Sequence, residues 1–300
     1  MTAITISIII PHYTKTDTVL LGKAVGSIPD NKDIQVIVVD NSPISIDKNL
    51  FDKRSNVEIY YSDKTKGAGH ARNIGLQHAK GIWLLFLDAD DFFTDDAFNL
   101  LEKYLKSDKD IVFFKMTSVY SDTMEPATRH EHYEAVINNY FKDKDEYHLR
   151  TKWPSPCAKL VSNDLVKRNN IIFDEVPASN DVMFGLKIGL AAKKIAADNN
   201  YIYCIIVEKG SLTNTISLKH IESRFDTIIR KNQMLKEHGY KKTNSVMNFI
   251  IQSTKYGPVP FIRLLSKALW SGNLFVGYQN WLKTLVSLKY KKNKNYLIKE

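Results

Sequence analysis

The chain has 300 residues, of which 44% are hydrophobic and 25% are charged, the composition of a folded globular protein rather than a disordered one. No segment reaches the roughly 20 apolar residues that a membrane-spanning helix requires, so an integral membrane protein is not expected. The first residues lack the basic start and cleavage site of a secretory signal, and Cys157 and Cys204 lack metal-type spacing. Together these features predict a protein of the reducing cytoplasm.

The formal charge of +9 is concentrated at the carboxyl end. Residues 255–300 hold nine Lys or Arg and one acid, a net +8, which leaves +1 for the preceding 254 residues. A basic charge spread over the whole chain would favour a nucleic-acid partner. The uneven distribution favours a local anionic surface instead, and no nucleic acid is expected as a partner.

Strand-like and helix-like segments alternate through the first 120 residues. Residues 4–10 (ITISIII), ended by Pro11, and residues 34–39 (IQVIVV) are nearly continuous apolar runs, as in strands covered on both faces. Between them, residues 17–28 place apolar side chains at a helical spacing. The other elements predicted here are a strand at 57–61, a helix at 69–79 capped by Gly81, and strands at 82–87 and 111–116. The alternation predicts a mostly parallel α/β sheet with helices on both faces.

Beyond about residue 120 the pattern is looser. Residues 129–146 are polar and rich in His and Tyr, which predicts a helical or mobile insertion, and a helix is predicted at 182–192. Residues 261–269 and 278–286 each repeat apolar side chains at a helical spacing, with lysines on the other face. The predicted organisation is a domain at 1–215, with halves at 1–117 and 118–215, and a basic amphipathic helical region at 216–300.

Polar residues follow three of the predicted strands, at positions 11–13, 40–42 and 88–91. In parallel α/β sheets, ligands bind outside the carboxyl ends of the strands. Asp88 and Asp90 form an Asp-x-Asp whose alternate positions point to the same side of an extended chain. Because Mg²⁺ and Mn²⁺ prefer carboxylate oxygens, this pattern favours a metal site, with a solvated acidic turn as the alternative.

The stretch GAGHARNIGLQHAKGIWLLFLDADD, residues 67–91, resembles the central signature of inverting nucleotide-sugar glycosyltransferases of family 2, which have the GT-A fold. ISIIIPHY resembles the opening strand of that family, where Asn often stands at the position of His12 or Tyr13, and VIVVDNS resembles its second strand. The resemblance covers residues 4 to about 114. It implies a Rossmann-like catalytic domain at 1–215, with nucleotide-sugar-binding and acceptor-binding halves, and a C-terminal helical extension.

The resemblance also implies roles for the donor side of the site. Asp90 would be the main ligand of a Mn²⁺ or Mg²⁺ ion, Asp88 would face the ribose or sugar, and Asp91 has no assigned role. Asp40 would hydrogen-bond the uracil or ribose, with a turn cap as the alternative, and Arg72 would lie over the diphosphate, with a surface salt bridge as the alternative. The implied nucleotide-sugar site comprises Pro11, His12, Tyr13, Asp40, Gly67, Gly69, Arg72, Asn73, Asp88 and Ala89.

On the acceptor side, residues 158–189 resemble the family segment that carries Glu-Asp before a helix. Asp181 is the implied general base, with capping of the following helix as the alternative. Asn180 stands where the family usually has Glu, which drops a charge but keeps hydrogen bonding. Trp153, Lys159 and Asn180 are the candidate acceptor-binding residues, although an aromatic residue at such a place is more often packed in the core.

The resemblance implies inverting transfer of a sugar from a UDP-sugar to a glycan acceptor, lipid-linked, in capsule, lipopolysaccharide or exopolysaccharide synthesis. The C-terminal helices are expected to hold the protein peripherally on the inner face of the cell membrane, with lysines contributing about 1 kcal/mol each at anionic lipids. Their alternative role is to complete the core of the catalytic domain. Two other function classes stay open: a nucleotidyltransferase-like enzyme, although this chain has PHYTKTD where a Gly-rich basic loop is usual, and a non-catalytic anionic-surface-binding protein.

Overall fold

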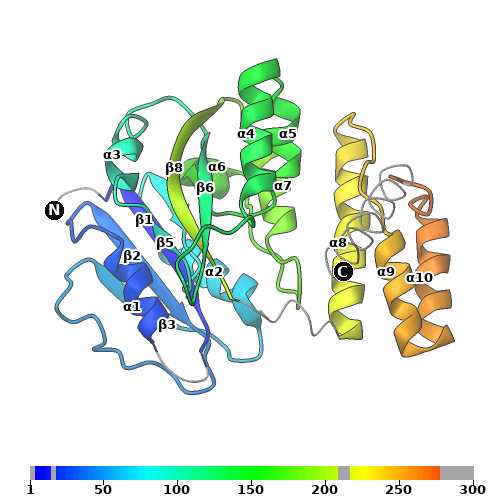
Figure 1. The fold of residues 1–300 in the computed structure, drawn as a ribbon, viewed down its shortest axis with the longest axis horizontal. Coiled ribbons are helices and arrows are strands. Elements are labelled where there is room, and N and C mark those ends of the chain that lie inside the picture. The colour runs from blue at the N-terminus through cyan, green and yellow to red at the C-terminus, as the bar shows by residue number, and fades with distance from the viewer. Residues whose placement is uncertain (1–3, 15–17, 209–216, 278–300) are drawn as a thin grey trace, which may run out of the picture. The chain divides into compact units, whose positions relative to one another are not determined.

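The computed structural model describes residues 4–14, 18–208 and 217–277 of the chain. Two compact units are present, Met1–Asn214 and Thr215–Glu300 (Figure 1). The first is a mixed α/β unit and the second is helical. Within the described ranges, no helix combines the length and the apolar character needed to cross a bilayer.

An eight-stranded sheet in the order β3-β2-β1-β4-β7-β6-β8-β5 forms the centre of the first unit. Its first half is parallel, as predicted: β1 (Ile6–His12) pairs with β2 (Ile34–Asp40) and β4 (Trp83–Phe86), and β2 pairs with β3 (Val57–Tyr61). Every residue of β1, β2 and β4 is buried. Burial on both faces explains why these strands are unbroken apolar runs rather than alternating ones.

The second half of the sheet is mixed. Strands β7 (Lys159–Ser162) and β5 (Phe92–Phe93) run antiparallel to their neighbours, whereas β6 (Ile111–Tyr120) and β8 (Ile195–Val207) are parallel to each other. Only the beginning of β6 was predicted from the sequence. The other three strands were missed because β5 and β7 are short and β8 has three exposed polar or aromatic residues at its centre.

Helices flank this sheet: α1 (Val19–Gly26), α2 (Gly67–His78), α3 (Ala97–Glu102), α4 (Glu131–Asp143), α5 (Glu146–Lys152), α6 (Asn163–Arg168) and α7 (Val182–Ala191). Figure 1 shows α4, α5 and α7 close together beside β6 and β8. The polar insertion predicted at 129–146 is therefore helical, and it forms a wall next to the second half of the sheet.

Two details differ from the predicted boundaries. Strand β1 continues through Pro11 to His12, because the nitrogen of Pro11 is on the side of β4, where pairing has already ended at Ile9. Gly81 does not cap α2, which ends at His78 with Ala79 after it. A side chain at Gly81 would lie 2.5 Å from the backbone nitrogen of Ser7, so close packing against β1 explains this glycine.

The second unit contains α8 (Leu218–Glu237), α9 (Met247–Ser253), a short 3-10 helix (Thr254–Tyr256) and α10 (Pro258–Trp270). These helices close a core of their own, formed by Ile221, Phe225, Val246, Ile250, Leu264 and Ala268. The helix predicted at 261–269 corresponds to α10. The one predicted at 278–286 lies outside the described residues.

Candidate active site

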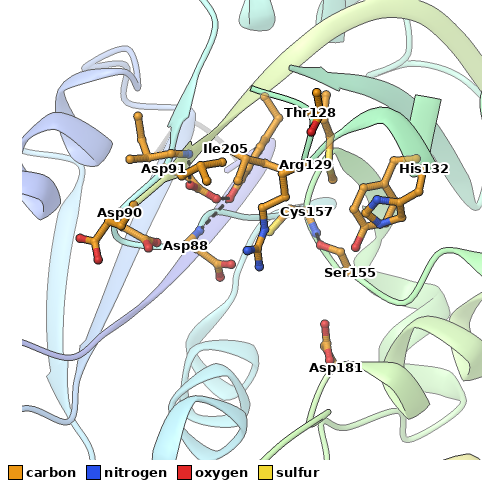
Figure 2. Close-up of a pocket in the computed structure, with 16 residues that line it drawn as sticks. Asp88, Asp90, Asp91, Thr128, Arg129, His132, Ser155, Cys157, Asp181 and Ile205 are labelled. Atoms are coloured by element: carbon orange, nitrogen blue, oxygen red, sulfur yellow. Dashed lines mark hydrogen bonds between the residues drawn. The ribbon is translucent and has the colours of Figure 1, made fainter. Parts of the chain in front are cut away.

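A cavity of about 560 Å³ opens beyond the carboxyl end of β4. Its lining combines the acidic turn after β4 with the segment that enters α4, the loop before β7 and the residue before α7. Figure 2 shows Asp88 and Asp90 on one side, His132 on the other, and Asp181 apart from the acidic turn. This position is the one at which ligands bind in open parallel sheets, next to the point where the strand order reverses between β1 and β4.

The acidic turn is fixed by Asp91, whose role the sequence left open. The buried Asp91 carboxylate accepts hydrogen bonds from the Tyr203 hydroxyl at 2.7 Å and from the Ile206 amide at 2.8 Å. The Tyr203 hydroxyl in turn accepts a bond from the Asp88 amide at 3.1 Å. Burial, then repulsion from Asp88 and Asp90, raises the pKa of Asp91 well above its usual range. Asp91 thus ties β8 to the turn and leaves Asp88 and Asp90 to face the cavity.

Asp88 forms an ion pair with Arg72, which lies on α2. One guanidinium nitrogen of the buried Arg72 donates to Asp88 Oδ1 at 2.6 Å and another donates to Asn180 Oδ1 at 2.9 Å. The guanidinium also lies over the Phe173 ring, 5.4 Å from its centroid. The ion pair of Arg72 is therefore not the exposed surface pair of the alternative interpretation. The guanidinium group joins the acidic turn to the loop before α7, and these contacts occupy donors that would otherwise reach a diphosphate.

Asp90 presents its carboxylate to the cavity. Asp90 is exposed at the mouth of the cavity, and partial loss of hydration there, followed by repulsion from Asp88, raises its pKa. Among the described residues, no three His, Cys, Asp or Glu side chains gather into a metal site. Two neighbouring carboxylates at the open side of a cavity fit a Mg²⁺ or Mn²⁺ ion that takes its other ligands from substrate phosphates and water, rather than an ion held by protein alone.

Asp181 directly precedes α7, but its side chain makes no capping hydrogen bond, so the helix-cap alternative does not hold. Burial raises the pKa of the Asp181 carboxyl, the positive charge of Arg72 partly opposes that rise, and Asp88 adds to it. A carboxylate with a raised pKa at the edge of a cavity has the properties of a general base.

The wall contributed by α4 and the loop before β7 carries neutral donors. Burial raises the pKa of Cys157 well above its usual range, and burial followed by the charge of Asp181 raises that of Tyr133. Both groups are therefore protonated at neutral pH. This wall also includes Arg129, which Figure 2 shows between the acidic turn and Ser155.

A second cavity, of about 350 Å³, collects predicted nucleotide-binding residues. Pro11, His12, Tyr13 and Gly67 line it, joined by Asn41, Lys64, Thr65 and Ala68. The buried Asp40 does not line this cavity, but it accepts hydrogen bonds from His12 Nδ1 at 2.9 Å and from the Ser42 hydroxyl at 2.5 Å. Burial opposes ionisation of Asp40, but hydrogen bonds from Ser42, His12 and Ile46 outweigh it and lower its pKa. Asp40 therefore stays charged and shapes the loop beneath the cavity.

Two further residues of the α2 segment have packing roles. Gly69 faces the backbone of the loop before α7, and a β-carbon there would lie 2.1 Å from the Asp174 carbonyl oxygen. The buried Asn73 exchanges hydrogen bonds with the Phe173 backbone, donating at 3.0 Å and accepting at 2.8 Å. Both hold the loop that carries Asp181, and neither lines the two cavities described above. Gly67 differs, because its φ of +70° is the left-handed conformation that favours glycine.

Trp153 and Lys159, candidates for acceptor binding, are each 1% exposed. Trp153 packs against Phe113 and Tyr133, and the Lys159 ammonium donates to the Trp153 carbonyl at 2.8 Å. Neither side chain offers a surface to an acceptor here, so their contacts are those of core residues. Asn180 reaches the site only through Arg72, and Ala89 is half-buried against the core.

Several lining residues were not predicted from the sequence: Thr128, Arg129, His132, Tyr133, Ser155, Cys157, Lys64 and Thr65. Most lie in the region where the strand–helix alternation fades. The excess of His and Tyr in the polar insertion at 129–146 is the sequence signal that accompanies them.

Comparison with known proteins agrees with this geometry. A family model described as glycosyl transferase family 2 matches residues 7–168. A cholesterol galactosyltransferase from Borreliella burgdorferi is 25% identical over 263 residues, covering 79% of this chain and 71% of that protein. The UDP-Glc:alpha-D-GlcNAc-diphosphoundecaprenol beta-1,3-glucosyltransferase WfaP from Escherichia coli is 24% identical over 248 residues, covering 81% and 90%.

Among solved structures, Staphylococcus aureus TarS 1–349 in complex with UDP-GlcNAc superposes with a TM-score of 0.62 and 18% identity, over 89% of this chain and 81% of that one. At that identity the likeness shows the fold alone, and it confirms the predicted GT-A sheet with a helical C-terminal region. The family model covers more than half of the chain, so this protein belongs to glycosyl transferase family 2 and is a glycosyltransferase.

Proposed function

We propose that the protein transfers a sugar from a UDP-sugar to a hydroxyl of a glycan acceptor, with inversion at the anomeric carbon. The observation that carries this proposal is the presence of Asp181 in the same cavity as Asp88 and Asp90, but apart from them (Figure 2). An inverting displacement needs groups that hold the donor diphosphate on one side of the reacting carbon and a base on the other. The E. coli relative is named for UDP-Glc, and the superposed TarS structure contains UDP-GlcNAc, which supports a UDP-sugar donor.

In this proposal the acceptor oxygen attacks the anomeric carbon while the bond from that carbon to the diphosphate oxygen breaks, and UDP leaves with the bonding electron pair. Asp181 takes the proton of the attacking hydroxyl and later releases it to solvent. The raised pKa of Asp181 brings its basicity closer to what proton transfer near neutral pH requires. The base thus acts at the acceptor, and the acidic turn acts at the donor.

The nucleoside would occupy the second cavity, against Tyr13, Asn41 and Gly67, where the left-handed Gly67 leaves open space. Asp88 would face the ribose or sugar, held in place by Arg72. Asp90, with Asp88, would hold a Mn²⁺ or Mg²⁺ ion, which when bound neutralises charge on the diphosphate.

The acceptor is proposed to be a glycan, lipid-linked, of an envelope polysaccharide, and the enzyme is proposed to lie peripherally at the inner face of the cell membrane. The E. coli relative, named for a diphosphoundecaprenol-linked sugar, supports a lipid-linked acceptor, and the Borreliella relative, named for cholesterol, supports an acceptor that lies in a membrane. The net +8 of residues 255–300 supports an anionic membrane surface.

Isothermal titration with UDP, ADP and a panel of UDP-sugars, each with and without Mn²⁺, tests the donor and the metal together. We expect UDP to bind more tightly than ADP, Mn²⁺ to strengthen the binding, and Asp90→Asn to weaken the Mn²⁺-dependent binding by at least about tenfold. Asp164→Asn, a matched change at an exposed acid, should have no effect. Equal binding of ADP and UDP, or Mn²⁺ dependence unchanged in Asp90→Asn, would contradict the proposal.

A further inference from the structure

Helix α10 departs from the pattern of a surface helix in a soluble protein. Its inner face, with Pro260, Leu264 and Ala268, is buried in the core of the second unit. The face turned away from that core would ordinarily be polar. It instead carries large apolar side chains that are strongly exposed: Val259 at 72%, Ile262 at 57%, Leu269 at 61% and Trp270 at 90%, followed after the helix by Phe275 at 77%.

The basic residues of α10 lie between these two faces and are already paired. Arg263 is bonded to Glu222, and Lys267 donates to Asp226 Oδ1 at 2.7 Å, with both acids on α8. These ion pairs fix the rotation of α10 against α8. Arg263 and Lys267 keep 57% and 52% of their side-chain surface exposed at the edge of the outward face, and Ser266 is a polar member of that face.

We propose that this outward face of α10, formed by Val259, Ile262, Leu269 and Trp270, is the surface through which the protein docks on an anionic lipid bilayer. An apolar helix face with a tryptophan at its end suits the headgroup–acyl boundary, where the indole ring is favoured. Contiguous exposed apolar side chains on a folded unit mark an interaction surface rather than ordinary solvent exposure.

Charge favours a bilayer over a second copy of this chain as the partner. After Trp270 the chain contains six lysines and one acid, Glu300, so the sequence that follows the apolar face carries a net +5. Each basic residue near an anionic membrane surface adds to the attraction, whereas two copies of this chain would bring like charges together. The choice of a bilayer rests on the proposed lipid-linked acceptor, and the location of the surface rests on α10 itself.

Co-sedimentation of the full-length protein with phosphatidylcholine vesicles, with and without phosphatidylglycerol, tests the proposal. We expect binding to the phosphatidylglycerol vesicles that weakens as salt is raised. The double change Leu269→Ser with Trp270→Ser should lower the partition coefficient by about tenfold or more, because the free energy of transferring two apolar side chains from water to the bilayer is lost. Ile82→Ser, a matched change at a 60% exposed residue of the first unit, should bind as the unchanged protein does.

Quenching of tryptophan fluorescence by bromine-labelled acyl chains locates the contact directly. In a Trp281→Phe background, where Trp83 and Trp153 are buried, we expect quenching that is lost on Trp270→Phe, which keeps an apolar ring and hence vesicle binding. Vesicle binding that is unaltered in the double variant, or bound protein whose Trp270 is not quenched, would overturn the proposal. A dimer that the double variant converts to a monomer would instead show that a second copy covers this face.

Hydrolysis of a UDP-sugar without vesicles separates this inference from the proposed function. The double variant should hydrolyse the donor as the unchanged protein does, because α10 holds none of the proposed catalytic or binding residues. Absence of hydrolysis in the unchanged protein would count against the proposed function and leave the vesicle result to stand by itself.

Discussion

Arg72 connects the two sides of the candidate site through a single guanidinium group. It bonds Asp88 on the donor side and Asn180 on the acceptor side, and it lowers the pKa of Asp181 against the opposing effect of burial. The asparagine at 180 keeps the contact with Arg72 without adding a negative charge. The charge of Arg72 is therefore left to balance Asp88 and Asp181, which explains how the site accommodates the loss of the glutamate usual in the family.

This arrangement predicts a shift in the pH profile. Asp181 acts as a base only when ionised, so activity falls as pH decreases through its pKa. Replacing Arg72 with Gln removes the charge that lowers this pKa, and we expect the acidic limb of kcat/KM to move to higher pH. Arg72→Lys, which keeps the charge but not the paired donors, should move the limb less. An acidic limb that stays in place in Arg72→Gln would show that Arg72 does not act on the base.

At the scale of elements, the approach of α2 to the loop before α7 positions the base. The two segments meet at Gly69, where the Asp174 carbonyl leaves no room for a side chain, and at Asn73, which binds the Phe173 backbone in both directions. The acidic turn is held separately, through Asp91 and β8. The donor and acceptor sides are thus anchored to different elements and meet in the cavity.

Gly69→Ala tests the first of these anchors. The added methyl group would force α2 and the loop apart, and we expect lower thermal stability, by about 1–3 kcal/mol, together with a fall in kcat. Gly22→Ala on α1 is the matched control, since a β-carbon there has nothing within 4 Å and alanine favours the helix by about 1 kcal/mol. Thermal unfolding and initial rates measured for both variants check this. A Gly69→Ala protein with unchanged melting temperature and kcat would mean that the contact does not position the base.

At the scale of the whole molecule, the parallel half of the sheet and its strand ends could be predicted because each strand is a continuous apolar run followed by polar residues. Asp88 and Asp90 line the cavity because they follow such a strand, whereas Asp181 was predicted only from the resemblance of its segment to the family. Arg129 and His132 were not, because they reach the cavity through the packing of α4 beside β6, which no local pattern encodes. Trp153 was a candidate for acceptor binding but is buried, because the local sequence around an aromatic residue in a loop does not say whether the side chain is buried or exposed.

In the helical second unit, too, the helix could be predicted from the sequence but the exposure of its side chains could not. The spacing of apolar residues predicted α10. Only the structure shows that Leu264 and Ala268 are buried while Ile262 and Leu269 are exposed, and hence that the outward face is apolar. The spacing of apolar residues alone predicts one apolar stripe along the helix and does not say which of its residues are buried. The structure shows that the stripe on the core side is not the whole apolar surface of this helix.

Single-turnover transfer from a UDP-sugar by Asp181→Asn shows whether Asp181 is the base of an inverting sugar transfer. We expect the rate of transfer to fall by a factor of about 10² to 10⁴ while UDP binding is retained, because asparagine cannot accept the proton. Glu175→Gln, on the same loop but bonded to His70 and Asn73, should keep most of the activity. Transfer by Asp181→Asn at the rate of the unchanged protein would show that Asp181 is not the base.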